Sequence, residues 1–230
     1  MKYIGEELEN FKYASLWRKY TISKIKKYLK GKKVLEVGSG IGSFSEILLK
    51  YVDELTLLEP DKEYCEILKK KFKNSDKIKE IHNGTISEIN KRYDAIIHFQ
   101  VLEHIEKDNE EILNNLNMIN ENGYMLICVP SFMSLYSKFD KSVGHHRRYV
   151  KQDFLNFNLG KSFIKKMIYI DSSGYIVYKL FKIFLNTDYP KKFMIIIWDK
   201  IFIPISFILD WLLKYKIGKN LIAVIQKKSS

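Results

Sequence analysis

The sequence contains little arginine and little cysteine. Only four of its 39 basic residues are arginines, and two of the four, Arg147 and Arg148, are neighbours. Its two cysteines, Cys65 and Cys128, lie far apart, with no CxxC pair and no spacing typical of zinc ligands. This excludes a disulfide framework and indicates a protein of the reducing cytoplasm.

The sequence also lacks hydrophobic runs that could serve as a leader or a membrane span. Its N-terminal segment carries charges from the start and has no apolar core of signal-peptide length, so secretion is not expected. The longest apolar stretch, 193–213, contains Asp199, Lys200 and Asp210, with Pro204 in its middle. Charged side chains are costly inside a bilayer, so we expect this stretch not to cross a membrane.

Acidic residues are outnumbered by basic ones, and the formal net charge is +12. The lysines are scattered through nearly every segment and form no single basic block. A protein that binds nucleic acid usually gathers such charge into a patch that neutralises phosphates. The composition therefore favours a solvated basic surface without a nucleic-acid partner, and a nucleic-acid enzyme stays as the alternative.

The chain alternates regularly between strand-like and helical apolar patterns. Strands are expected at 34–37, 54–58, 78–81, 93–98 and 123–129. Helices are expected at 11–30, 43–52, 61–72 and 107–119. Buried parallel strands form continuous apolar runs, and right-handed crossovers need connections of helix length. The pattern thus predicts an α/β fold with a doubly wound, mostly parallel sheet.

The pattern is less regular beyond Pro130. We expect a short helix at 151–158, a strand at 163–169, helical apolar segments and a last strand at 221–226. The last two strands are expected to pair as an antiparallel hairpin at the sheet edge, with the helical insertion between them covering one face. No repeat or linker divides the chain, so a single domain over 1–230 is expected.

A glycine-rich turn follows the first predicted strand. Such a turn lets the backbone approach a nucleotide-like ligand at the carboxyl edge of the sheet. A dinucleotide site is the first alternative, but the third glycine, Gly42, comes one place too early for that pattern, and Glu36 precedes the first glycine. A carboxylate suits an ammonium or sulfonium ion better than a pyrophosphate. S-adenosyl-L-methionine carries both cations and no phosphate.

The second predicted strand ends at Glu59. An acidic residue about 20 positions after a glycine turn commonly binds ribose hydroxyls, and one carboxylate can accept a hydrogen bond from both. The alternative is that the segment 59–61 merely caps the next helix.

Three motifs resemble those of class I S-adenosylmethionine-dependent methyltransferases: VLEVGSGIG at 34–42, LLEP at 57–60 and YDAIIHFQVLEHI at 93–105. The resemblance implies a Rossmann-like domain with a helical cap at 1–30, a cofactor-binding core at 31–130 and an acceptor region at 131–230. It also implies the cofactor residues, which are Glu36, Gly38, Ser39, Gly40 and Gly42 around the methionine moiety, Glu59 at the ribose, Gly84, Thr85 and Ile86 near the adenine, and Phe99 and Gln100 beside the methionine end.

A second resemblance is narrower. The segment LYSKFDKSVGHHRRY at 135–149 is similar to a loop, approximately LYxxxDxxxGHxRRY, of a methyltransferase branch associated with bacterial surface-polysaccharide and lipid-linked glycan pathways. It implies a small-molecule or glycan acceptor, nucleotide-linked or lipid-linked, that is O-methylated. The other hypotheses are a nucleic-acid methyltransferase and a non-catalytic cofactor-binding module.

Candidate acceptor residues lie in the same loop. A hydroxyl acceptor needs a base, and histidine suits that role at neutral pH. We expect His145 to be the base, with Asp140 orienting it and His104 as the second choice. Arg147 and Arg148, with Tyr149, are expected to clamp a phosphate or carboxylate of the acceptor, because arginine binds planar anions better than lysine does. Intramolecular ion pairing of the arginines is the alternative.

No group of residues has metal-ligand spacing, so no metal is expected. In the apolar stretch 193–213, the polar residues Asp199, Ser206 and Asp210, followed by Lys214, form a narrow stripe on a mostly apolar helix, with a possible break at Pro204. Such a helix is expected to pack against its own domain or a twin subunit. The alternative is shallow insertion into the inner membrane face, aided by nearby lysines, which are Lys191, Lys192, Lys214, Lys216 and Lys219.

Overall fold

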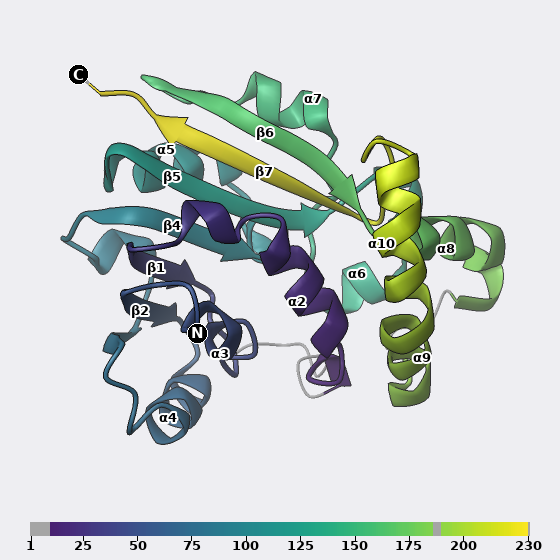
Figure 1. Ribbon diagram of the computed structural model, residues 1–230, viewed down its shortest axis with the longest axis horizontal. Coiled ribbons are helices and arrows are strands. Elements are labelled where there is room, and N and C mark those ends of the chain that lie inside the picture. Colours follow the sequence, from purple (N-terminus) through teal and green to yellow (C-terminus); the bar gives the residue numbers. More distant parts are fainter. Residues whose placement is uncertain (1–9, 186–189, 230) are drawn as a thin grey trace.

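A central sheet of seven strands organises the molecule (Figure 1), in a computed structural model that describes residues 10–185 and 190–229. The strand order is β3-β2-β1-β4-β5-β7-β6. The strands are β1 (Lys33–Val37), β2 (Glu54–Glu59), β3 (Ile78–Asn83), β4 (Tyr93–Phe99), β5 (Ile119–Pro130), β6 (Ser162–Ile170) and β7 (Asn220–Lys227). The first nine residues of the expected N-terminal cap lie outside the described residues.

The first five strands run parallel, and β7 lies antiparallel between β5 and β6. The predicted doubly wound sheet with an antiparallel final pair is therefore confirmed. The chain order reverses between β1 and β4, because β2 and β3 extend the sheet on one side and β4 and β5 on the other. In open α/β sheets, such a switch point opens a crevice at the carboxyl ends of the strands.

Helices connect the strands and cover both faces of the sheet. They are α2 (Ser15–Ser23), α3 (Ser45–Leu48), α4 (Lys62–Lys71), α5 (Asp108–Asn117), α6 (Lys138–Ser142), α7 (Lys151–Asn156), α8 (Ser172–Leu185), α9 (Lys192–Ile197) and α10 (Ile203–Leu212). Short 3₁₀ turns lie at Lys26–Tyr28, Ile86–Glu88, Leu102–His104 and Met133–Leu135, and a π turn lies at Trp198–Phe202. The expected helix at 43–52 is shortened to α3, because the bonds Lys50 N to Ile47 O and Tyr51 N to Leu48 O close turns of 3₁₀ type directly after it.

The alternation of side chains along the strands builds one apolar core on each face. Val34, Leu55 and Leu57 pack on the face covered by α2 and by the α9–α10 segment, to which Trp17 and Ile203 contribute. The residues between them point to the opposite face. There, buried side chains of β1, β4 and β5 meet α5 and α7, and these are Leu35, Val37, Ile96, Met125, Ile112, Leu116 and Phe154.

The apolar segment 192–212 is one uninterrupted helical column in Figure 1, formed by α9, the π turn and α10. Pro204 is the second residue of α10, directly after the π turn, and the helix continues through this irregular segment. It therefore does not break the helix. Among the described residues, no helix combines the length and apolarity needed to span a bilayer.

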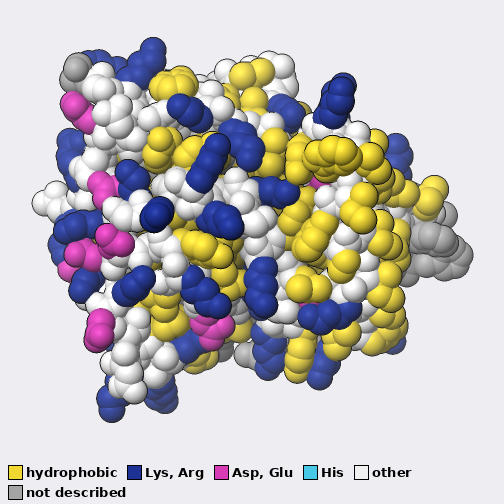
Figure 2. All heavy atoms as spheres, in the orientation of Figure 1, with side chains coloured by type: hydrophobic (Ala, Val, Ile, Leu, Met, Phe, Trp, Pro, Cys, Tyr) yellow, Lys and Arg dark blue, Asp and Glu magenta, His cyan; other side chains and the backbone are white. Residues whose placement is uncertain are grey.

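The polar stripe on this helix faces inward. Asp199, Ser206 and Asp210 are fully buried. Asp199 accepts hydrogen bonds from the backbone N–H groups of Leu16 and Trp17, and Asp210 accepts one from the hydroxyl of Tyr20. The domain leaves most of the apolar side exposed, because α2 binds the polar stripe, and cover by a twin subunit stays a prediction. Figure 2 shows the result as a broad hydrophobic area over α9 and α10.

Candidate active site

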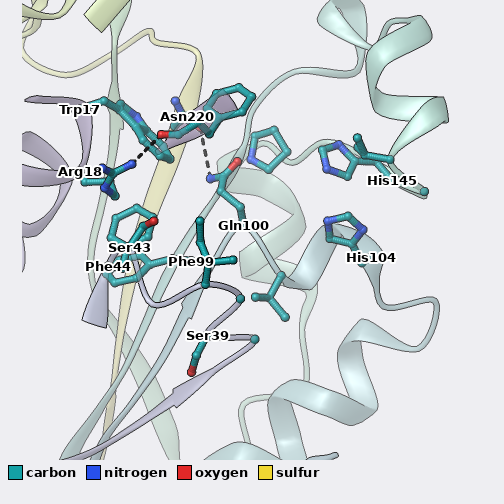
Figure 3. A pocket seen from close by; sticks show the side chains of 18 of the residues that line it. Trp17, Arg18, Ser39, Ser43, Phe44, Phe99, Gln100, His104, His145 and Asn220 are labelled. Carbon is teal, nitrogen blue, oxygen red and sulfur yellow. Dashed lines mark hydrogen bonds between the residues drawn. The ribbon is translucent and has the colours of Figure 1, made fainter. Parts of the chain in front are cut away.

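A cavity of about 910 Å³ lies at the carboxyl ends of β1, β2 and β4, between the sheet and the α9–α10 segment. Figure 3 shows residues from the glycine turn, the end of β4 and the GHHRRY segment around this space. Binding sites for small molecules usually occupy roughly 300–1,000 Å³. The cavity therefore has room for a nucleoside-sized ligand and an acceptor beside it.

The glycine turn brings bare backbone to the cavity wall. Gly38 and Gly40 have φ angles of 67° and 53°, in the region that favours glycine. A Cβ atom on Gly38 would lie 2.5 Å from the side chain of Val101. Gly38, Ser39 and Gly40 line the cavity as predicted, but Gly42 does not. A Cβ on Gly42 would lie 2.7 Å from Phe72, so this glycine serves the packing of the turn on α4.

Glu36 places a buried carboxylate on the cavity wall. Its side chain accepts a 2.5 Å hydrogen bond from the hydroxyl of Ser45. Burial raises the pKa of Glu36 to about 8, although the Ser45 hydrogen bond acts in the opposite direction. A cation in the cavity would compensate the buried negative charge. The site thus fits a ligand that carries an ammonium or sulfonium group.

Glu59 and Asp61 have separate tasks. Asp61 is the N-cap of α4 and accepts from the backbone N–H groups of Glu63 and Tyr64. Glu59 accepts from the N–H of Gly40 over 2.7 Å and from that of Asp61 over 2.9 Å. Both acids line the cavity, and burial raises the pKa of Glu59. Capping is therefore the work of Asp61, and Glu59 lies at the cavity, where ribose binding was expected.

The remaining predicted cofactor residues also line the cavity. Gly84, Thr85 and Ile86 follow β3, while Phe99 is the last residue of β4 and Gln100 follows it. The ring of Phe99 stacks on Phe44 with 4.1 Å between centroids. The side-chain amide of Gln100 donates to Asn220 over 3.3 Å, which joins β4 to the start of β7 (Figure 3). The sequence did not single out Phe44 or Asn220.

His145 is held at the cavity by Asp140. Its Nδ1 lies 2.8 Å from Asp140 Oδ1, and its side chain is 8% exposed. Asp140 also receives two hydrogen bonds from the Arg148 guanidinium, 2.8 and 2.9 Å long. Burial alone would raise the pKa of Asp140, but its interactions with His145 and Arg148 lower it well below the usual range. An ionised Asp140 thus fixes the ring of His145.

Glu103 and His104 complete a cluster around His145. The imidazole Nε2 of His145 lies 3.9 Å from Glu103 Oε1, and neither carboxylate oxygen of Glu103 has a hydrogen-bond partner. Burial raises the pKa of Glu103 to about 7 and lowers that of His104 to about 3. One ligand atom from each of the three residues lies within 4.8 Å of the others, so the cluster could hold a metal ion. Sequence spacing missed it, because His145 comes from a distant loop.

The two arginines of the loop are separated. Arg148 is 5% exposed and bound to Asp140, whereas Arg147 donates to Asp108 Oδ2 over 2.9 Å and to the carbonyl of Glu106. Only Arg148 borders the main cavity, while Arg147 lies in a second, shallower hollow. The structure thus records the intramolecular ion pairs that the sequence left as the alternative.

Tyr149 lies outside the main cavity. It is 1% exposed and donates its hydroxyl hydrogen bond to Asp108 over 2.8 Å, in the core beneath the loop. In this structure the side chain of Tyr149 is packed in the core, so it does not reach the main cavity, where contact with the acceptor was expected.

Further lining residues come from both ends of the chain, which motif spacing did not reveal. Trp17 and Arg18 of α2 lie opposite the two labelled histidines in Figure 3. Lys219, just before β7, has its ammonium nitrogen 5.0 Å from the ring centre of Trp198 and 5.5 Å from that of Tyr178. Burial lowers the pKa of Lys219, while the charge of Asp171 acts in the opposite direction.

Comparison with known proteins identifies the family to which this chain belongs. The model of a family described as "Methyltransferase domain" matches residues 13–159. No protein of curated function matches the sequence.

Solved structures share the fold at low sequence identity. A chain in the complex between the Haloferax volcanii Trm112 methyltransferase activator and a putative methyltransferase is 11% identical, with a TM-score of 0.63 over 97% of this chain and 92% of that one. A putative methyltransferase from Bacillus halodurans is 12% identical, with a TM-score of 0.60 over 91% and 98%. The N-methyltransferase NodS from Bradyrhizobium japonicum, in complex with S-adenosyl-l-homocysteine, is 12% identical, with a TM-score of 0.56 over 95% and 86%.

Proposed function

We propose, from the premise that this chain belongs to the methyltransferase domain family and binds S-adenosyl-L-methionine, that it methylates an oxygen atom of a small glycan precursor. The cofactor supplies an electrophilic methyl group on a sulfonium ion. The buried carboxylate of Glu36 and the bare backbone of Gly38 and Gly40 fit the cationic end of that ligand, and Glu59 fits its ribose.

The arrangement around His145 is the observation that carries the proposal. Its Nδ1 bonds to an ionised Asp140, which leaves Nε2 as the nitrogen able to take a proton. The same carboxylate stabilises the imidazolium that forms. As an acceptor oxygen bonds to the methyl carbon, its proton moves to His145 Nε2. Proton transfer to a positioned base contributes roughly 10²–10⁴-fold to a rate.

Glu103 lies next to this base. With a pKa raised to about 7 by burial, its carboxyl group exchanges protons in the neutral range. It lies 3.9 Å from His145 Nε2 and borders the ring that Asp140 holds through Nδ1. We assign Glu103 the role of a positioning residue that acts through His145.

An anionic acceptor would find its cation in Lys219 rather than in the arginine pair. Lys219 lines the cavity, and its ammonium group lies over the rings of Trp198 and Tyr178. Arg148 is committed to Asp140, and removal of one partner from a buried ion pair costs roughly 3–5 kcal/mol. Substitution of Arg148 would therefore test folding more than acceptor binding.

The chemical class of the acceptor is the most specific part of the proposal. The loop at 135–149 resembles that of enzymes in surface-polysaccharide and lipid-linked glycan pathways, and the mostly apolar cavity wall suits an acceptor with an apolar portion. A phosphate or sugar hydroxyl of a nucleotide-linked or lipid-linked glycan meets both conditions.

The test is methyl transfer from an isotopically labelled cofactor into fractionated bacterial extracts. Nucleotide-sugars, lipid-linked glycans and RNA are incubated separately with the protein, and the label in each fraction is counted. We expect label in a glycan fraction and its loss with the His145→Asn variant. Label confined to RNA would contradict the glycan acceptor and indicate a nucleic-acid methyltransferase. Cofactor binding without transfer to any fraction would indicate a non-catalytic module.

A further inference from the structure

We infer that the outward face of α9 and α10 docks onto the surface of an anionic lipid bilayer. This face carries large apolar side chains that the domain leaves uncovered. Ile208, Trp211 and Leu212 are 66%, 67% and 60% exposed. Isolated exposed apolar residues are common on proteins, but a continuous patch usually marks an interaction site.

The patch is a ridge along one side of the helical column. Its members recur every three or four positions, the spacing that aligns side chains on one helical face. They are Phe193, Ile197, Ile201, Ile205, Ile208 and Leu212. In Figure 2, the ridge appears as a broad yellow area in the place that α9 and α10 occupy in Figure 1.

The helix is turned opposite to an ordinary surface helix. In a water-exposed helix the apolar face packs inward and the polar face meets solvent. Here the polar residues Asp199, Ser206 and Asp210 are fully buried and bound to neighbouring backbone and hydroxyl groups. These fixed contacts hold the ridge outward. The orientation is therefore built into the fold and suits an apolar environment outside the protein.

The charges around the ridge identify the partner. Within 190–219, both acidic residues, Asp199 and Asp210, are buried, and every exposed charge is a lysine. The exposed lysines are Lys191, Lys192, Lys200, Lys214 and Lys216. Apolar side chains that enter the acyl boundary, with lysines at the level of the headgroups, are typical of helices that lie in the membrane interface.

A second copy of the chain fits this surface less well. Two such ridges placed face to face would bring their flanking lysines together, and like charges across an interface repel. An anionic bilayer neutralises the same lysines. Because none of the described helices could span a bilayer, the helix would lie along the surface.

Docking would place the cavity beside the membrane. The inner side of the same helical column lines the cavity through Ile195, Trp198 and Phe202. Ile197 both lines the cavity and is 43% exposed. The inference itself rests on the exposed ridge and its charges, and it stands whether or not the proposed acceptor is correct.

Vesicle sedimentation tests the inference. The protein is mixed with vesicles of phosphatidylcholine alone and with vesicles that also contain phosphatidylglycerol, at low and high salt. The Ile208→Glu and Leu212→Glu double variant is compared with a control, Ile67→Glu with Leu155→Glu, which changes exposed apolar residues outside the ridge. Circular dichroism and cofactor titration verify that both variants remain folded.

We expect wild-type protein and the control to bind the anionic vesicles, more weakly at high salt, and the ridge variant to bind about tenfold less or worse. Equal vesicle binding by the two variants would overturn the inference, and so would no binding by wild-type protein. A wild-type dimer that the ridge variant dissociates, without vesicle binding, would assign the face to a second copy. Cofactor affinity, measured separately, tests the proposed function and is expected to be unchanged by the ridge substitutions.

Discussion

At the scale of single residues, three buried carboxyl groups lie at or near the cavity and differ in their pKa values. Glu36 and Glu103 have pKa values raised by burial to about 8 and about 7, whereas Asp140 is kept ionised by its two basic partners. Groups whose environments push their pKa values apart often mark acid–base and ligand-binding roles. We therefore expect these three carboxyl groups to contribute to ligand binding or to proton transfer.

We predict that Glu36→Gln stabilises the ligand-free protein at pH 8.5. The pKa of Glu36 is about 8 in the folded protein and 4.5 ordinarily, so the folded state holds a proton that the unfolded chain releases. Its contribution to the free energy of unfolding declines as pH rises from 4.5 to 8 and is constant above that, with a penalty on the order of 5 kcal/mol. Urea denaturation should show the variant more stable at pH 8.5, with the difference shrinking toward pH 5.

The amide is the appropriate replacement because it keeps the shape and can still accept the Ser45 hydrogen bond. A stability difference that does not change with pH would show that Glu36 is not protonated in the folded protein.

His145→Asn should lower kcat by about 10²–10⁴-fold while leaving the cofactor dissociation constant unchanged. The neighbouring His146 is exposed and offers a matched control, since its backbone rather than its side chain bonds to Glu103. His146→Asn should retain activity. Equal losses in the two variants would indicate disruption of the loop rather than loss of a base.

The same assay tests whether the Glu103, His104 and His145 cluster works with a metal ion. We propose that it does not, because Nε2 of His145, the ring nitrogen nearest Glu103, is the atom that takes the acceptor proton in the proposed step and a metal ion bound there would block it. Treatment with a chelator should leave the methyl-transfer rate unchanged. Loss of activity that a divalent cation restores would reassign the cluster as a metal site.

At the scale of elements, the strands were the part of the fold that the sequence predicted best. Apolar runs located the parallel strands, most weakly β3, where Lys79 and Glu80 interrupt the run, and the glycine turn and the acids at strand ends followed from their positions. The connection after β1 was predicted less well. The apolar spacing at 43–52 is helical, but the structure tightens most of it into turns between the glycine turn and β2.

Two glycines, one before β1 and one in the glycine turn after it, give a prediction at this scale. Gly31 and Gly42 have nearly equal φ angles of 70° and 74°. A Cβ on Gly31 would meet nothing within 4 Å, whereas one on Gly42 would lie 2.7 Å from Phe72 and 2.8 Å from Leu68. Gly31→Ala should cost about 1–2 kcal/mol from backbone conformation alone, and Gly42→Ala should cost more.

Chemical denaturation of the two variants measures the difference. Because Gly42 lies outside the cavity lining, its variant should bind the cofactor normally at temperatures where it is folded. Equal stability losses in the two variants would show that the side chains next to Gly42 can move aside at little cost.

At the scale of the whole molecule, the sequence could not reveal which distant residues meet. The arginine pair suggested an anion clamp, but Asp108 and Asp140 approach it from other parts of the chain and engage both guanidinium groups. Likewise, helical spacing identified the polar stripe at 199–210 but not its direction. That direction depends on the backbone groups of α2, nearly two hundred residues earlier in the chain.

The central claim is that the cavity binds a cationic nucleoside through the carboxylate of Glu36. Calorimetric titration at pH 8 with S-adenosyl-L-methionine, and separately with a pyrophosphate-bearing dinucleotide, tests it most directly. The account predicts saturable binding of S-adenosyl-L-methionine to wild-type protein, binding at least about tenfold weaker to Glu36→Gln, and no binding of the dinucleotide. Binding of the dinucleotide in preference to S-adenosyl-L-methionine, or equal affinity of wild-type and Glu36→Gln protein for the latter, would contradict it.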